Sequence, residues 1–173
     1  MFNDLAIAAN RLIAEGDVTR VLILDLDVHQ GDGTAALTAG RDDIFTLSIH
    51  AEKNFPARKA RSTIDVGLPD GTGDADYLAV LTDVLPRALD AFRPGLILFQ
   101  AGVDADKEDK LGRLALTDPG LEARDLYVAD AARARAIPIA SALGGGYGAD
   151  RMAVARRHAR TMVGLAEFSA LSP

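Results

Sequence analysis

The sequence has 173 residues, of which 49% are hydrophobic and 25% charged, a balance typical of one soluble globular domain and not of a disordered or membrane-spanning chain. Its 19 basic and 25 acidic side chains leave a net charge of −6, which argues against general binding to a nucleic-acid backbone. Cysteine is absent, so disulfides and thiolate ligands are excluded, and any transition metal would be held by imidazole and carboxylate groups.

Helix-like and strand-like segments alternate along the chain. Residues 3–14 have apolar side chains at helical spacing, with Asn3 or Asp4 as the cap and Gly16 as the end of the helix. The pattern then predicts a buried strand from Val21, a short helix at 34–39, a strand at 44–49, a helix at 76–92, a strand at 96–99, a helix at 121–136, a strand at 137–143 and a helix at 150–168. Prolines and glycines interrupt residues 51–74, which we expect to form a long surface loop. Four strands alternating with helices indicate a parallel sheet covered on both faces.

Polar side chains follow the first strand in the stretch 21–34, which reads VLILDLDVHQGDGT. Ligands of open α/β sheets bind at the carboxyl ends of strands, and in extended backbone Asp27 and His29 point to the same face. Asp104, after another strand, could add a third ligand and leave a coordination position open for water, as in catalytic zinc sites. The alternatives are that Asp27 and Asp104 cap the following helices and that His29 is a structural histidine.

Asp25 lies deep in the apolar strand, where a carboxylate is costly unless it is paired or bound to a cation. A structural monovalent cation or a buried histidine would resolve this cost, and Ser48 at the end of the next strand is placed to contribute an oxygen. The alternative is that Ser48 and His50 satisfy backbone groups of a loop, which we prefer for His50. His158, among the arginines of the last helix, is expected to be solvated.

A run of glycines, residues 144–146, follows the last predicted strand and precedes Tyr147. The run could cradle a phosphate, but it lacks the spaced glycines of a dinucleotide site and the lysine of a P-loop. Glycines also let the backbone approach a ligand closely while the next side chain points inward. That side chain would be Tyr147, a neutral hydrogen-bond donor at pH 7, and the alternative is a buried structural tyrosine.

Three segments together closely resemble the histone deacetylase superfamily, which includes bacterial histone deacetylase-like proteins, acetoin-utilisation proteins and acetylpolyamine amidohydrolases. They are residues 25–34 (DLDVHQGDGT), 100–104 (QAGVD) and 143–147 (LGGGY), in the order and spacing of the family. The resemblance covers almost the whole chain. It implies a three-layer, arginase-like α/β fold with a mainly parallel sheet flanked by helices. It also implies a zinc-dependent amidohydrolase that removes acyl groups from lysine or from small amines.

The resemblance also implies roles for single residues. Asp27, His29 and Asp104 would bind one catalytic Zn²⁺, and Tyr147 would donate a hydrogen bond to the scissile carbonyl. The residues that would hold a structural K⁺ through side-chain and main-chain oxygens are Asp25, Asp27, His29, Ser48 and Ile49. The residues that would line the substrate tunnel are Phe55, Gly145 and Gly146. For Phe55 the alternative is an ordinary aromatic side chain on a surface loop.

The family uses two adjacent histidines as general base and acid, each oriented by an aspartate that matches Asp25 or Asp32, and this chain has no His-His pair. In the family that pair precedes the segment matching residues 2–4, and family domains run to about twice this length. The chain therefore reads as a single partial domain, residues 1–173, apparently truncated at its N-terminus. Because a positioned general base typically contributes about 10²- to 10⁴-fold in rate, we expect a zinc site with weak or no deacylase activity.

The expected partner is an acylated lysine or a small acylated amine, with no nucleic acid and no membrane. Neither a secretory signal nor a span of about 20 apolar residues occurs, so a cytoplasmic location is expected. In the family the N-terminal part supplies several strands of the sheet. Without them we expect an open sheet edge, which a second copy of the chain or the missing N-terminal segment would cover. Loops 52–61 and 106–113 are candidates for the tunnel mouth.

Three other classes share parts of the pattern. A haloacid-dehalogenase-like phosphatase begins with Asp-x-Asp but continues with Gly-Thr, where this chain has Val28 and His29. A metal-dependent glycosyltransferase with Asp-x-Asp would not explain Asp104 or the glycine run. The strongest alternative is a non-catalytic module of the deacetylase fold that binds metal or acyl-lysine without hydrolysing it.

Overall fold

The computed structural model describes residues 3–170, with side chains described up to residue 167. Its elements in chain order are α1 (Asp4–Glu15), β1 (Val21–Asp25), α2 (Asp32–Leu37), β2 (Ile44–Ala51), β3 (Ile64–Leu68), α3 (Asp74–Phe92), β4 (Leu96–Ala101), α4 (Asp118–Arg133), β5 (Ile139–Leu143) and α5 (Arg151–Ala170). Every predicted helix and strand is present. In the described part of the chain, no helix has both the length and the apolar character needed to cross a bilayer.

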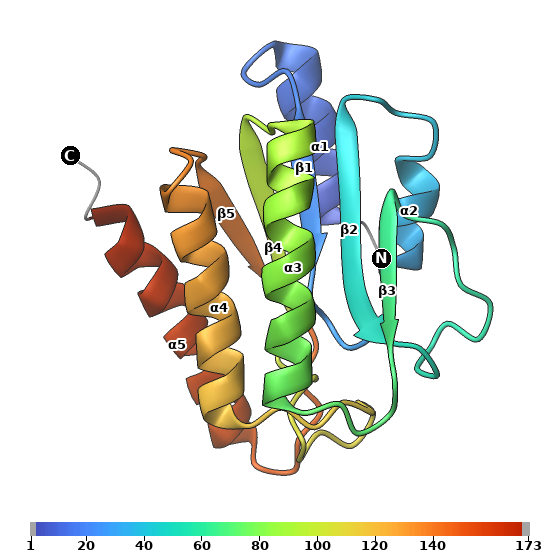
Figure 1. Ribbon diagram of the computed structural model, residues 1–173, viewed down its shortest axis with the longest axis vertical. Coiled ribbons are helices and arrows are strands. Elements are labelled where there is room, and N and C mark those ends of the chain that lie inside the picture. The colour runs from blue at the N-terminus through green and yellow to red at the C-terminus, as the bar shows by residue number, and fades with distance from the viewer. Residues whose placement is uncertain (1–2, 171–173) are drawn as a thin grey trace.

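The strands form one parallel sheet in the order β3-β2-β1-β4-β5, with β1 in the centre. Helices α3, α4 and α5 cover one face of the sheet, and α1 and α2 lie behind the other, which gives three layers (Figure 1). The prediction of a three-layer α/β fold with a parallel sheet is confirmed. The carboxyl ends of the strands meet at the lower edge in Figure 1, where the loops after β1, β4 and β5 gather.

Strand β1 alternates its side chains between two apolar clusters, and all five of its residues are buried. Leu22 and Leu24 pack in the larger cluster with α3 and α4, whereas Val21 and Ile23 pack against α1. Covering on both faces explains why the strand reads as an unbroken apolar run. Burial of each such side chain contributes about 1.5–3 kcal/mol, which stabilises the strand that carries the polar rim.

Residues 51–74 do not form one long loop, because β3 lies within them and pairs with β2. In β3 the half-buried Ile64 and Val66 alternate with the exposed Asp65 and Gly67. A short edge strand with a glycine inside it gives a weak periodic signal, and its pairing with β2 decides its structure. The sheet therefore has five strands where the sequence pattern predicts four.

Three helices begin two or three residues earlier than predicted, among them α3, which begins at Asp74 and not at residue 76. Helix α2 begins at Asp32 and α4 begins at Asp118, where the hydroxyl of Thr117 accepts the amide hydrogen of Gly120 at 3.1 Å. Pro119 follows in the first turn, where a proline is tolerated because its missing N–H would have no helical partner. The predicted boundaries of α1 are correct to one residue: Asn3 caps its start and Gly16, with φ +82°, ends it.

Candidate metal centre

Two neighbouring loops bring three candidate ligands together at the carboxyl edge of the sheet. Asp27 and His29 follow β1, and Asp104 follows β4. One ligand atom from each residue lies within 4.8 Å of the others. Nδ1 of His29 is 3.0 Å from Oδ1 of Asp27 and 3.2 Å from Oδ2 of Asp104. Because β1 and β4 pair directly, the chain topology alone makes these two loops neighbours.

Backbone amides hold both carboxylates in place. Asp27 accepts the amide hydrogens of His29 and Gly145, each at 2.9 Å, and Asp104 accepts that of Val28 at 2.9 Å. Neither carboxylate caps a helix, since α2 has no side-chain cap and Thr117 caps α4. The interpretation of Asp27 and Asp104 as helix caps is therefore wrong.

The electrostatics of the group favour a positive charge between the two carboxylates. Hydrogen bonds to Asp104 and Asp27 raise the pKa of His29 to about 10. Burial raises the pKa of Asp104 to about 6, whereas for Asp27 the hydrogen bonds from His29 and from backbone amides outweigh burial and lower its pKa. A divalent cation satisfies the same two carboxylates and takes the imidazole in its neutral form, so binding would displace the proton of His29.

Asp25 is the last residue of β1 and faces the same side of the sheet as its register partners Ser48 and Gln100. It is 8% exposed, and Gly31 packs directly on it, where a Cβ would lie 2.2 Å from Oδ2. Its Oδ1 accepts the amide hydrogen of Asp27 at 3.1 Å. Burial raises the pKa of Asp25 well above its usual range. A buried carboxylate of this kind fits a bound cation or a histidine partner.

Ser48 and His50 lie inside β2 and are both buried. The hydroxyl of Ser48 lies 2.9 Å from Nδ1 of His50. The interpretation that these side chains serve the backbone of a loop is therefore wrong, because the strand extends further than its apolar run predicts. Ile49 packs its side chain in the core, so only its main chain can face a cation next to Ser48.

A surface hollow opens over these groups. It is lined by the start of α1, by the polar rim from Asp25 to Thr34, by Phe55 and by Gln100. Asp32 lies half-buried in this rim, with its Oδ1 accepting the amide hydrogen of Gly33 at 2.8 Å, and Phe55 is 71% exposed. Asp25 and Asp32 therefore border the same hollow as Asp27 and His29.

The glycine run, residues 144–146, packs directly against the side chain of Asp104. A Cβ on Gly145 would lie 1.8 Å from Oδ2 of Asp104, and Gly146 has φ +150°. Tyr147 follows with 48% exposure, its ring centroid 6.4 Å from that of His29 in an edge-on arrangement. It is not the buried structural tyrosine of the alternative interpretation. Burial, together with the carboxylates of Asp104 and Asp27, raises the pKa of Tyr147, which keeps the phenol protonated at pH 7.

Sequence reasoning missed two residues that support this arrangement. Asp109 accepts the amide hydrogen of Tyr147 at 2.6 Å, and Arg124 lies wholly buried beneath the ligand loops. Neither belongs to a short motif, and both contacts join distant parts of the chain, so no local signal could find them. His158 is half-buried and not solvated, and burial lowers its pKa.

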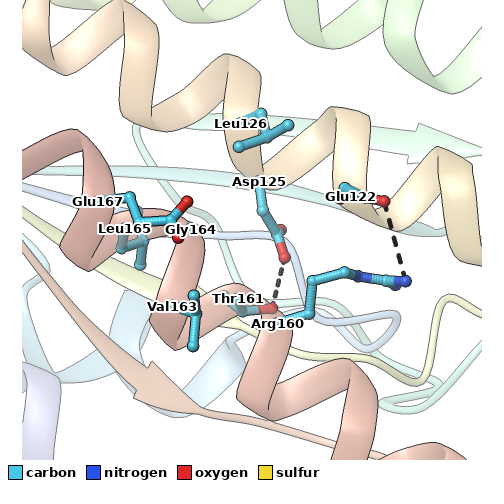
Figure 2. A pocket seen from close by; sticks show the side chains of 9 residues that line it. All are labelled: Glu122, Asp125, Leu126, Arg160, Thr161, Val163, Gly164, Leu165 and Glu167. Atoms are coloured by element: carbon cyan, nitrogen blue, oxygen red, sulfur yellow. Dashed lines mark hydrogen bonds and ion pairs between the residues drawn. The ribbon is translucent and has the colours of Figure 1, made fainter.

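A separate cavity lies between α4 and α5, and Figure 2 shows the side chains that line it. Asp125 points toward Thr161 there, and Glu122 toward Arg160. None of the candidate metal ligands borders it. The candidate ligands predicted from the sequence thus lie at the carboxyl edge of the sheet and not in this cavity.

Comparison with known proteins identifies the family of this chain. Residues 1–163 match the family model of the histone deacetylase domain. The chain belongs to the histone deacetylase family. The match covers the loops after β1, β4 and β5, which carry the three segments of the resemblance.

Two curated bacterial proteins are similar to this chain. An uncharacterized protein of Picosynechococcus sp. is 43% identical over 158 residues, which cover 91% of this chain and 53% of that protein. The histone deacetylase-like amidohydrolase of Pseudomonas aeruginosa is 36% identical over 146 residues, which cover 78% of this chain and 38% of that enzyme. The chain thus spans about half the length of these relatives, or less.

A solved structure of the acetylpolyamine aminohydrolase from Burkholderia pseudomallei has the same fold. It superposes with a TM-score of 0.79 at 24% identity, over 96% of this chain and 50% of that protein. At this identity the likeness concerns the fold alone. The membership of this chain in the histone deacetylase family rests on the family match and on its relatives.

Proposed function

We propose that the chain carries the zinc centre of a histone deacetylase-type amidohydrolase that acts on acyl-lysine or on a small acylated amine. One observation carries the proposal: ligand atoms of Asp27, His29 and Asp104 lie within 4.8 Å of one another, under the turn that bears Tyr147. Imidazole and carboxylate groups both bind zinc, and a set of three protein ligands leaves the fourth position of a catalytic zinc open for water. The similar protein of Pseudomonas aeruginosa is named an amidohydrolase, and that of Burkholderia pseudomallei is named an aminohydrolase.

The roles of the chain's own groups follow from their contacts. Zinc, when bound, polarises an amide carbonyl and lowers the pKa of a bound water. Tyr147 is neutral at pH 7 and exposed beside His29, so its hydroxyl can donate to the oxygen of the acyl group as negative charge develops there. Gly145 and Gly146 allow this approach, and Phe55 offers an apolar surface at the rim of the hollow.

Activity of this chain alone is proposed to be weak or absent. The sequence contains three histidines and no adjacent pair. His29 contacts the two candidate carboxylate ligands, His50 contacts Ser48, and His158 lies on α5. Asp25 and Asp32 border the hollow, where they would orient the two adjacent histidines of the family. In this sequence the two aspartates have no such histidines to orient. The expected loss is about 10²- to 10⁴-fold in rate relative to a complete enzyme.

A structural K⁺ is proposed beside the zinc centre. Asp25 and Ser48 are register partners on one face of the sheet, which puts a carboxylate and a hydroxyl oxygen next to each other. Main-chain oxygens of Asp27, His29 and Ile49 would complete the set. A monovalent cation there would offset the cost of burying Asp25, whose pKa burial raises.

The outer edge of β5 is the proposed place for a further strand. Within residues 3–170, β5 pairs with β4 on one side only, and its residues are half-buried or exposed. A second copy of the chain, or a further segment of a longer protein, would pair with this edge. Light scattering tests the first case, in which the mass rises with concentration, and a stable monomer at high concentration would rule that case out.

The test of the function combines metal binding with hydrolysis. The purified chain should bind one zinc, measured by competition with a chelating dye, and Asp27→Asn and Asp104→Asn should each abolish that binding. Asp42→Asn, an exposed acid before β2, is the control and should bind zinc as the unmodified chain does. Zinc affinity that is unchanged in Asp27→Asn would refute the proposal.

Assays of hydrolysis with an acetyl-lysine peptide and with an acetylated polyamine then distinguish an amidohydrolase from a non-catalytic binding module. Slow, zinc-dependent turnover supports the amidohydrolase. Binding of the acetyl-lysine peptide without any turnover supports the second candidate, a non-catalytic module, which the missing His-His pair favours.

A further inference from the structure

Arg124, on α4, lies beneath the two loops that carry the candidate metal ligands. Its side chain is fully buried, with 0% exposure. Nη1 donates to the carbonyl oxygen of Gly102 at 2.7 Å and to that of Leu26 at 3.2 Å. Leu26 directly precedes Asp27, and Gly102 lies two residues before Asp104. One guanidinium group therefore joins the main chains of both ligand loops.

The two loops are in direct contact above this guanidinium. The last ladder bond between the two segments runs from the amide of Leu26 to the carbonyl of Gln100, at 3.1 Å. Beyond it Gly102 passes so close to Asp27 that a Cβ would lie 2.6 Å from Oδ2 of that carboxylate. A small shift between the loops would therefore move Asp27 relative to Asp104, and Arg124 is tied to the main chain of both loops at this point.

The guanidinium is itself fixed to two helices. Its Nε donates to Oδ1 of Asp125 at 2.8 Å, and the other oxygen of Asp125 accepts the hydroxyl hydrogen of Thr161 on α5 at 2.5 Å (Figure 2). A buried ion pair is often no more stable than well-packed apolar side chains of the same volume. We therefore expect the Arg124–Asp125 pair to affect the position of the carbonyl groups of Leu26 and Gly102 more than overall stability.

We propose that Arg124 is a positioning residue for the metal centre, which sets the separation of Asp27 and Asp104 by holding the two loops at fixed spacing. The inference rests on the proposed function of these residues as zinc ligands. Groups that orient metal ligands typically contribute 10- to 100-fold to metal affinity. Arginine suits the role because its rigid fork presents several N–H donors in one plane.

The test compares Arg124→Gln, Arg124→Lys and the double variant Arg124→Met/Asp125→Asn, which removes the buried charges together. Zinc affinity is measured by dye competition, and Co²⁺ absorption reports the geometry of the ligands. We expect Arg124→Gln and the double variant to bind zinc about 10- to 100-fold more weakly. Arg124→Lys, which keeps the charge but lacks the planar fork, should recover only part of the affinity.

Val128→Ala is the matched control, because Val128 is fully buried one helical turn further along α4. It should lower the midpoint of thermal unfolding and leave zinc affinity unchanged. Affinity of Arg124→Gln equal to that of the unmodified chain would overturn the inference. The inference would also be overturned if Val128→Ala and Arg124→Gln, with the same loss of stability, lost the same amount of zinc affinity.

Amide exchange of the metal-free protein gives an independent readout. The amides of Val28 and Gly145 donate to Asp104 and Asp27, and they should exchange faster in Arg124→Gln than in Val128→Ala. If the unmodified chain binds no zinc, the proposed function fails, and the exchange rates alone decide the role of Arg124. Equal protection in the two variants would then refute it.

Discussion

Gly145 lies directly against the carboxylate of Asp104, so close that a Cβ at Gly145 would stand 1.8 Å from Oδ2. Its own amide hydrogen is donated to Asp27 at 2.9 Å, which ties the glycine run to both carboxylates. Glycine is required at position 145 because any side chain would collide with Asp104, and not because of the backbone conformation. The contact also joins the loop after β5 to the loops after β1 and β4.

Gly145→Ala should therefore displace Asp104 and weaken zinc binding about 10- to 100-fold. Dye competition measures the effect. Gly33→Ala is the control, because a Cβ there meets only Nδ2 of Asn3 at an ordinary 3.7 Å, and alanine within α2 should stabilise the protein by about 0.5–1 kcal/mol. Equal zinc affinity in the two variants would show that the loop yields to the added methyl group.

Asp109 should hold Tyr147 in place. Its carboxylate accepts the amide hydrogens of Tyr147 at 2.6 Å, of Leu111 at 2.8 Å and of Gly112 at 2.9 Å. Asp109→Ala removes all three hydrogen bonds, so exchange of the Tyr147 amide should be about 10-fold faster, as expected for a lost hydrogen bond of about 1.5 kcal/mol. Glu108→Ala, at the exposed neighbouring position, is the control. Unchanged exchange in Asp109→Ala would contradict the assigned contact.

The sequence predicts the centre of this fold better than its edges. Strand β1 could be predicted because burial on both faces makes its pattern continuous, and Asp27 and His29 follow it within one short motif. Strand β3 could not, because only its contact with β2 stabilises a short segment that contains Gly67. The meeting of Asp27 with Asp104 required the family resemblance or the sheet order, since nothing local joins them.

The contacts of Arg124 and His158 could not be predicted from the sequence, for a different physical reason. Arg124 reads as one charged residue on an ordinary helix, and only the packing of α4 under the sheet edge reveals that it is buried. The arginines near His158 suggest a solvated face, yet α5 turns that histidine toward the glycine run, where Nε2 would lie 3.4 Å from a Cβ on Gly146. Long-range contacts of this kind leave no periodic trace in a sequence.

Asn54 should be needed to hold together the two loops expected at the tunnel mouth. It is buried, donates to the carbonyl oxygen of Leu111 at 2.7 Å and accepts the amide hydrogen of Arg113 at 2.9 Å. Asn54→Ala leaves both backbone groups without this partner, so it should lower the free energy of unfolding by about 1–3 kcal/mol. Urea denaturation measures the loss. The exposed neighbour substitution Lys53→Ala should lie within about 0.5 kcal/mol of the unmodified chain, and an equally small effect of Asn54→Ala would refute the prediction.

His158 should make the protein less stable in mild acid. Burial holds its pKa below the usual range, and Nδ1 has no hydrogen-bond partner in the part of the chain that the structure describes. The groups that face it have opposing effects: the backbone of Gly145 and the charge of Asp125 favour the protonated ring, and Arg124 disfavours it. Because burial outweighs the favourable contacts, the folded protein binds this proton less readily than the unfolded chain does.

The sign of the pH dependence follows from that difference. Above the unfolded pKa of about 6.5 the ring is neutral in both states, and stability is at its full value. As the pH falls through 6.5 toward the lower folded pKa, the unfolded chain takes up the proton first, and stability declines. In His158→Gln the decline should be smaller between pH 7.5 and pH 5, as urea denaturation at each pH would show. The pKa of His50 is also lowered by burial, but His50 is present in both proteins, so the difference between them isolates His158. Parallel stability curves for the two proteins would mean that His158 is not buried against the glycine run in solution.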